Sequence, residues 1–410
     1  MKLFTNAKII DFKNKRFKNV NILINDNKIY KIYEINEIIK ENLEETQTFD
    51  CKNNIILAGF VNSQSYLIEN FFFNNTKENN LDEFREEYNT FYKSLTDEEK
   101  FLIYKYQMLN AIKNGVTTIC DNDYYNLPLK KAVKETGIDF VYKLGNDGDK
   151  NIVDEKLIKK LEANNDKYIL SLKSILFNGE EDFEDIINFS RNYNRPILIE
   201  GSESILMAGE IEKNFGQTNI ELLENYGILD QNHIILNPNI LDKNEYEILS
   251  NYDSKLLFSP SLNFNFGFKT ANIYALNKQN LIGLSSFCND YFLELFLTRN
   301  LEKDGYNNLE MFSGIELLNF VENNAKILSL ENSGVLKEGN DANFILLDLE
   351  NVLEVSQMIK NFDNRNIKAV YIQGELVYSN SHFVENKDYS KLENSCIKII
   401  KSYLQKNFHN

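Results

Sequence analysis

From about residue 55 onward the chain repeats one pattern: a short apolar run, a polar loop and an amphipathic stretch. Eight of these runs have the length and composition of buried β-strands, and they cover residues 55–61, 116–121, 140–143, 168–172, 197–200, 233–237, 255–258 and 281–286. Strands that alternate with helices over this length predict an α/β fold, a (β/α)₈ TIM barrel. A doubly wound open sheet is the structural rival, but no Gly-rich dinucleotide turn follows the first run.

Helical patterns separate most of the runs. The clearest begins at Thr96, where Glu99 three residues later predicts a capping box. Apolar positions at helical spacing follow until Asn114 and Gly115, which predict the end of the helix. The remaining helical patterns cover residues 127–136, 154–162, 181–193, 220–226 and 314–328.

The two ends of the chain have β character. Short β-rich runs lie near the N-terminus, with turn residues at 25–27, and β character returns at 335–347 and 369–378. Neither end has enough apolar surface to form a stable sheet alone, so we expect one composite β-sandwich domain built from both. The predicted division is 1–54 plus 331–384 for this domain, 55–330 for the barrel and 385–410 for a terminal helix. That helix is expected to pack as a tail, with partner binding as the alternative.

Composition and charge exclude several classes of function. The 410 residues are 43% hydrophobic and 26% charged, and the net charge of −16 opposes binding to nucleic acids. No apolar run approaches the roughly 20 residues that span a bilayer, and the N-terminus lacks the apolar core of a signal peptide. The four cysteines are widely spaced. Together these features predict reduced thiols, no membrane partner and a cytoplasmic location.

Several short motifs, in order and at the right spacing, resemble the amidohydrolase superfamily. The resemblance is strongest to its branch of S-adenosylhomocysteine/methylthioadenosine deaminases and related chlorohydrolases, and it spans about residues 1–380. It implies a TIM barrel with a metal-dependent hydrolase site. The motifs lie at residues 4–11, 57–66, 114–118, 214–218, 260–267, 333–343 and 373–377.

The resemblance also assigns candidate site residues, and most differ from the family pattern. The family's P-G-F-V-N-x-H-x-H segment has two metal-binding histidines where this chain has Gln64 and Tyr66. Glu200 stands at the fifth-strand metal histidine, and Asn237 at the sixth-strand histidine that helps to activate water. Phe287 replaces the eighth-strand aspartate, which binds metal and transfers protons.

Two further candidates carry charge. Glu203 aligns with the glutamate that shuttles protons in the deaminases, so it is the one catalytic candidate; it is either a remnant of that site or a polar anchor for a ligand. Lys173 falls where the family often has a substrate-contacting histidine. It is either a surface-loop lysine or a partner of Glu200 in an ion pair that substitutes for the metal.

The candidate ligands are too weak for a transition metal. A zinc site needs about three nitrogen, sulfur or carboxylate ligands, and only Glu200 is a strong one at these positions. The chain has three histidines. We expect His233 to be structural at the far end or wall of the barrel, and His382 and His409 to be solvated. The sequence therefore predicts that the metal site is lost and that no cofactor is bound.

The lost metal ligands favour a non-catalytic role, with a hydrolase as the alternative. The first hypothesis is a pseudoenzyme that binds a small molecule in a mixed polar and aromatic cavity, or that acts through a second copy or an active paralogue. The second is a hydrolase of C–N bonds, such as a deaminase of a purine or related heterocycle, with an unconventional site. A third, metal-free hydrolysis with Glu203 as base, has no positive support. Serine or Cys288 nucleophiles are disfavoured because no histidine is placed to activate them.

Overall fold

The computed structural model describes residues 1–77, 81–145, 153–306, 312–348, 352, 354–361, 363–385 and 388–408. A barrel of parallel strands forms its centre, and neighbouring strands follow one another in chain order. This confirms the predicted (β/α)₈ barrel. The barrel strands are β6 (Phe60–Ser65), β7 (Val116–Tyr124), β8 (Asp139–Gly145), β9 (Lys167–Leu172), β10 (Ile197–Glu200), β11 (Ile234–Leu236), β12 (Lys255–Phe258) and β13 (Leu281–Leu284).

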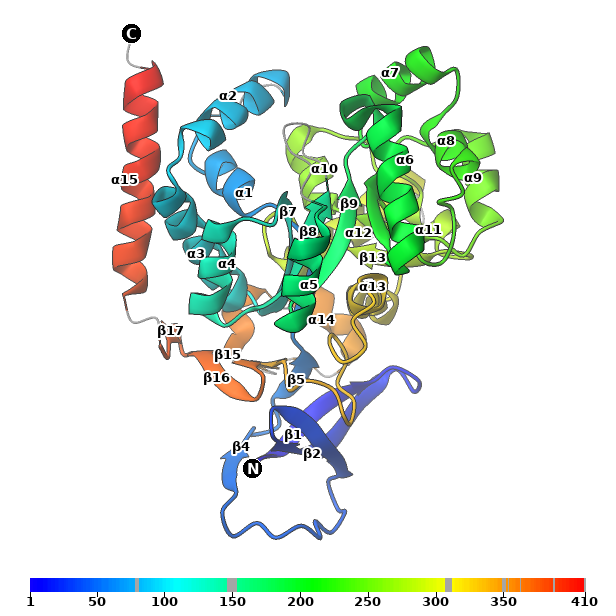
Figure 1. Ribbon diagram of the computed structural model, residues 1–410. Coiled ribbons are helices and arrows are strands. Elements are labelled where there is room, and N and C mark those ends of the chain that lie inside the picture. The colour runs from blue at the N-terminus through cyan, green and yellow to red at the C-terminus, as the bar shows by residue number, and fades with distance from the viewer. Residues whose placement is uncertain are drawn as a thin grey trace.

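Helices surround the barrel and cover one of its ends (Figure 1). The Thr96 capping box forms as predicted, with the Thr96 side chain accepting a hydrogen bond from the Glu99 backbone N–H. The helices from α1 to α13 are α1 (Leu67–Phe73), α2 (Leu81–Ser94), α3 (Asp97–Lys113), α4 (Leu127–Thr136), α5 (Glu155–Ala163), α6 (Ile175–Tyr193), α7 (Ile205–Phe215), α8 (Asn219–Asn225), α9 (Lys243–Ser250), α10 (Pro260–Phe266), α11 (Ile273–Leu276), α12 (Tyr291–Tyr306) and α13 (Gly314–Ile327).

Strands from both ends of the chain form a second sheet below the barrel in Figure 1. Its order is β17-β16-β15-β14-β5-β1-β2-β3, with β4 beside β1. Asp26 and Asn27 both have positive φ and make the tight turn that was predicted between β2 and β3. The strands are β1 (Lys2–Asp11), β2 (Arg16–Asn25), β3 (Lys28–Glu34), β4 (Gln47–Asp50), β5 (Ile55–Ala58), β14 (Phe344–Leu347), β15 (Ile367–Ile372), β16 (Glu375–Ser379) and β17 (His382–Phe383). The short helices η1 (Val355–Gln357), α14 (Met358–Asn361) and η2 (Asn364–Asn366) precede β15.

The predicted first barrel strand, 55–61, is in fact two strands. β5 pairs with β14 and β1 in the second sheet, whereas β6 pairs with β7 in the barrel. The chain changes sheets at Gly59, where a Cβ atom would lie 2.3 Å from the Thr117 side chain. Only glycine fits this close approach, so one apolar run supplies both sheets.

Side chains join the two strands at which the barrel closes. Asn324 of α13 donates from Nδ2 to the carbonyl oxygens of Val61 on β6, at 2.8 Å, and of Leu284 on β13. Its Oδ1 accepts from the Leu284 N–H at 3.0 Å. The Tyr291 hydroxyl lies 2.7 Å from the Val61 oxygen and 3.0 Å from the Leu284 oxygen. The buried polar groups of this seam are therefore satisfied by side chains.

The terminal helix α15 (Tyr389–Phe408) lies along α3 (Figure 1). Cys396, Ile400 and Tyr403 are buried against the main core. The Tyr403 hydroxyl also donates to the Glu87 carbonyl of α2 at 3.2 Å. These contacts agree with a packed tail. All four cysteines are free thiols, and none of the described helices is both long and apolar enough to cross a bilayer.

Candidate functional site

Most candidate residues lie at the carboxyl ends of the barrel strands, which we call the barrel mouth. Gln64 is the last residue but one of β6, Glu200 ends β10, and Asn237 and Phe287 follow β11 and β13. The side chains of Gln64, Asn237 and Phe287 are at most 1% exposed. This end of a TIM barrel is where the loops between strands and helices build active sites. The barrel thus presents these positions at its functional end.

A lysine that the sequence did not single out lies beside Gln64. Lys143 of β8 is 2% exposed, and its Nζ donates to Gln64 Oε1. Gln64 in turn donates from Nε2 to Asn122 Oδ1 at 3.0 Å. Burial lowers the pKa of Lys143, while the negative charges of Glu200 and Asp121 act to raise it. Lys143 is thus hydrogen-bonded to a residue that the family resemblance aligns with a metal ligand.

Two carboxyls of β7 interact electrostatically with this lysine. Asp121 on β7 accepts a hydrogen bond from the Leu67 N–H at 2.9 Å, and Asp123 accepts one from the Tyr104 hydroxyl. Burial raises the pKa of both carboxyls, and the Asp123 charge raises that of Asp121 further. Burial thus shifts both carboxyls toward their neutral forms.

The charged candidate Glu203 forms an ion pair with α2. Its Oε1 lies 2.6 Å from Arg85 Nη2; the Glu203 side chain is 18% exposed and that of Arg85 46%. Burial, and then the Glu200 charge, raise the pKa of Glu203 to about 7, and Arg85 opposes this shift. Burial and then the Glu203 charge raise the pKa of Glu69 on α1 to about 8. Both carboxyls can therefore hold a proton near neutral pH.

The expected ion pair between Lys173 and Glu200 does not form. Among the described residues, no ion pair joins Lys173 to Glu200. Arg85 pairs with Glu203 instead. Lys173 follows β9 and is half-buried. Its charge favours the ionised forms of Glu69 and Asp123. The lysine that contacts a metal-ligand position is Lys143.

Aromatic rings cover the mouth. Phe287 packs against Tyr66 and Phe73 with ring centroids 5.4 Å apart in each case, and against Phe266 at 5.7 Å. Phe84 of α2 lies 5.0 Å from Phe266. Burial raises the pKa of the Tyr66 phenol well above its usual value of 10, so this hydroxyl keeps its proton. The polar and aromatic residues expected to line a cavity are packed together in this conformation.

Asn237 has one side-chain atom without a partner. Its backbone is in the left-handed region at φ 48°, and its Oδ1 accepts from the Ser259 N–H at 3.0 Å. Its Nδ2 is buried and has no hydrogen-bond acceptor among the described residues. A buried unpaired donor costs about 1–3 kcal/mol. This amide is thus available to a ligand acceptor.

The donor set of the mouth does not fit a transition-metal ion. The Gln64 oxygen already accepts from Lys143, the Tyr66 phenol is protonated, and Phe287 has no donor atom. Within the described residues, no three histidine, cysteine or acidic side chains gather in a way that could hold a metal. A zinc site needs about three such ligands.

The histidines lie elsewhere. His233 Nδ1 accepts from the Ile197 N–H at 3.2 Å, at the amino end of β10, which fits the structural role expected of it. His382 is exposed in β17, and His409 lies outside the described residues. Cys288 is close to the mouth, but burial raises its thiol pKa to about 12. A cysteine nucleophile is not supported.

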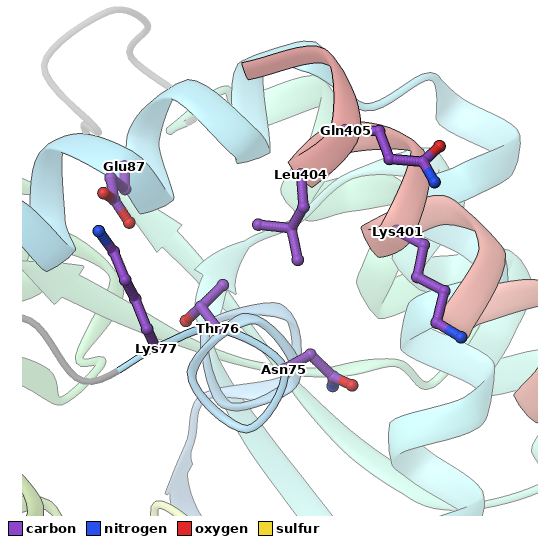
Figure 2. Close-up of a pocket in the computed structure, with 7 residues that line it drawn as sticks. All are labelled: Asn75, Thr76, Lys77, Glu87, Lys401, Leu404 and Gln405. Carbon is purple, nitrogen blue, oxygen red and sulfur yellow. The ribbon is translucent and has the colours of Figure 1, made fainter. Parts of the chain in front are cut away.

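A surface cavity of about 460 Å³ lies between α15 and the α1–α2 region (Figure 2). Figure 2 shows residues from the segment that follows α1, from α2 and from α15 around it. None of the candidate residues lines this cavity, which is therefore separate from the barrel mouth. Its lining residues are Asn75, Thr76, Lys77, Glu87, Lys401, Leu404 and Gln405.

Several residues of the mouth escaped the sequence analysis. Lys143 and Asp121 each stand at the end of a predicted apolar run, 140–143 and 116–121. A charged residue near the carboxyl end of a barrel strand lies at the functional face, and this was the available signal. No local signal marks Glu69 or Arg85. Glu69 lies on α1 and Arg85 on α2, and Arg85 reaches the mouth through its ion pair with Glu203.

Comparisons with known proteins confirm the family resemblance. A 5-methylthioadenosine/S-adenosylhomocysteine deaminase from Caldicellulosiruptor saccharolyticus is 25% identical over 96% of this chain and 95% of its own length. A 5'-deoxyadenosine deaminase from Methanococcus aeolicus is 26% identical over 92% of this chain and 95% of its own. A solved adenosine deaminase from Xanthomonas campestris with bound zinc has the same fold, with a TM-score of 0.84 at 13% identity over 98% of both chains. The model of the amidohydrolase family matches residues 55–377, and the chain therefore belongs to this family.

Proposed function

We propose that the barrel mouth binds an adenosine-like nucleoside. The observation that carries this proposal is the buried Asn237 Nδ2, which has no acceptor among the described residues. A purine ring offers nitrogen acceptors to such an amide, and its face can stack on aromatic side chains. Glu200 and Glu203 can accept hydrogen bonds from an exocyclic amine or from ribose hydroxyls. Relatives named as deaminases of adenosine derivatives support the same ligand class.

The ligand must displace groups that cover the mouth. Gln64, Asn237 and Phe287 are almost fully buried, and α2 places Phe84 on the aromatic rings and Arg85 on Glu203. The ion pair between Arg85 and Glu203 is weak, on the order of 0–1 kcal/mol, because the Arg85 side chain is half-exposed. Opening this contact is therefore a small part of the cost of binding.

The chemistry of the mouth favours binding without metal-dependent hydrolysis, because its donor set does not fit a metal. A second candidate function is metal-free deamination, and the raised pKa values of Glu69 and Glu203 favour it. In this reaction water adds to the purine carbon, the C–N bond breaks and ammonia leaves. Glu203, with a pKa of about 7, would take a proton from the water and return it to the departing amine. Relatives named as deaminases support the deamination itself.

A thermal-shift experiment tests the binding proposal. Adenosine, 5'-deoxyadenosine and methylthioadenosine should raise the melting temperature, whereas ribose and AMP should not. A ligand at about 100 times its Kd stabilises the fold by about 2.7 kcal/mol. Asn237→Asp keeps the Ser259 contact and removes the free donor, so it should abolish the shift. The control Asn194→Asp has the same charge change at another left-handed asparagine, a helix C-cap. A full shift in Asn237→Asp would refute the proposal.

Ammonia release separates the two candidate functions. Binding alone predicts none from any ligand that shifts the melting temperature. Release that survives chelation and stops in Glu203→Gln would establish metal-free deamination. Release that stops with chelation would show that a metal binds despite the donor set, and it would contradict the assessment of the site given above.

A further inference from the structure

We infer that the ammonium of Lys143 is a built-in cation that takes the place of a metal ion at the barrel mouth. This role concerns the architecture of the mouth and does not depend on which ligand binds there. It differs from the expected pairing of Lys173 with Glu200, because the structure ties a different lysine to a metal-ligand position.

The first argument is contact. Lys143 Nζ donates to Gln64 Oε1, and Gln64 occupies the place of the first metal histidine in the family motif. A metal bound at that position would need this same side-chain oxygen. The Gln64 amide is further fixed by its bond to Asn122 at 3.0 Å, so the oxygen stays turned toward the ammonium.

The second argument is charge. The Glu200 charge acts to keep the proton on Lys143, against the burial that lowers the pKa of this lysine, and Glu200 aligns with another metal ligand of the family. In a metal site this negative charge would be balanced by the ion. In this chain a 2% exposed side chain on strand β8 supplies the balancing positive charge. Glu200 thus keeps a cationic neighbour without a metal.

The third argument concerns the sign of the stability effect. An unpaired buried ammonium would be a burden, and its replacement by an apolar side chain would stabilise the fold. An ammonium that balances carboxylates and pairs with Gln64 would, on removal, leave those groups uncompensated. The two cases predict opposite shifts in melting temperature when Lys143 is replaced by methionine.

We therefore expect Lys143→Met to lower the melting temperature by at least about 3 °C. The matched control is Lys255→Met on β12, a half-buried lysine that contacts the Ile327 carbonyl and Ser329. It should have a smaller effect. An unchanged or raised melting temperature in Lys143→Met would overturn the inference.

A metal-binding experiment tests the same role by another route. The double variant Gln64→His/Tyr66→His supplies two strong nitrogen donors beside Glu200 and keeps Lys143. Adding Lys143→Met removes the competing charge, so the triple variant should bind zinc at least about tenfold more tightly than the double variant. Zinc affinity is measured by chelator competition and stoichiometry by elemental analysis. Equal zinc affinity in the two variants would overturn the inference.

The wild-type protein provides a test that needs no variant. After incubation with zinc and desalting, it should retain far less than one zinc per chain. Near-stoichiometric zinc in the wild type would overturn the inference even if the variants did not fold. Loss of folding in Lys143→Met alone, with Lys255→Met folded, would support it as the extreme form of the expected destabilisation.

Discussion

Replacing Asn324 by leucine should destabilise the barrel at its closing seam. The change keeps the size of the side chain but removes its amide, which serves the Val61 and Leu284 carbonyls and the Leu284 N–H. The Tyr291 hydroxyl has one proton, so it can donate to only one of the two carbonyls. One carbonyl and one N–H are therefore left buried and unpaired.

The magnitude follows from these two groups. Each buried unpaired group costs about 1–3 kcal/mol, and the added apolar surface of leucine offsets about 1 kcal/mol. The expected loss in the free energy of unfolding is about 1–5 kcal/mol, measured as a lower midpoint in urea denaturation. The control Asn323→Leu removes the hydrogen bond to the Ile282 carbonyl and an exposed one, 3.4 Å long, from Lys326 Nζ, at a half-buried site. A loss below about 1 kcal/mol for Asn324→Leu, or one equal to the control, would refute the seam argument.

Two further predictions concern stability. The melting temperature should fall as the pH rises from about 5 to about 8, because the folded-state pKa values of Glu69 and Glu203, about 8 and 7, lie above their usual value of 4.5. The folded state then binds protons that the unfolded state has released. Calorimetry should show a flatter pH profile for Glu69→Gln, and a wild-type melting temperature that rises over this range would contradict the shifts. Ending the chain at residue 388 should lower the melting temperature, because it uncovers the core beneath Ile400 and Tyr403. Lys398→Ala, an exposed change on the same helix, should have little effect, and an unaltered melting temperature on truncation would show that α15 contributes nothing.

The barrel could be predicted because its strands are apolar runs with clear ends. Residues 197–200 and 255–258 match β10 and β12 to the residue. The split of residues 55–61 could not be predicted, since the run is continuous and the need for glycine at Gly59 arises from Thr117 on the next strand. Helix α2 also escaped notice. Its buried positions are Phe84 and Phe91, which are too few to give a clear helical period.

The candidate site was predicted only where a motif fixed the register. The motifs placed Gln64, Asn237 and Phe287 at the carboxyl ends of strands, and the structure puts them there. The partners of these residues come from elsewhere in the chain. Arg85 lies 118 positions from Glu203, and Lys143 lies 79 positions from Gln64. Such pairings depend on how helices and strands pack, which local patterns do not encode. The predicted division into domains is still a prediction.

The charge of the mouth favours an uncharged ligand over a phosphorylated one. Burial favours the protonated forms of Glu69 and Asp121, so the mouth carries less negative charge than its carboxyls would have in water. Lys143 and Arg85 already hydrogen-bond to Gln64 and Glu203. A phosphate would have to take one of these cations from its present partner and lose its own hydration in a buried site, which is costly. A neutral nucleoside needs only hydrogen bonds and ring contacts. This is why a melting shift with adenosine and none with AMP is the pattern that the proposed site requires.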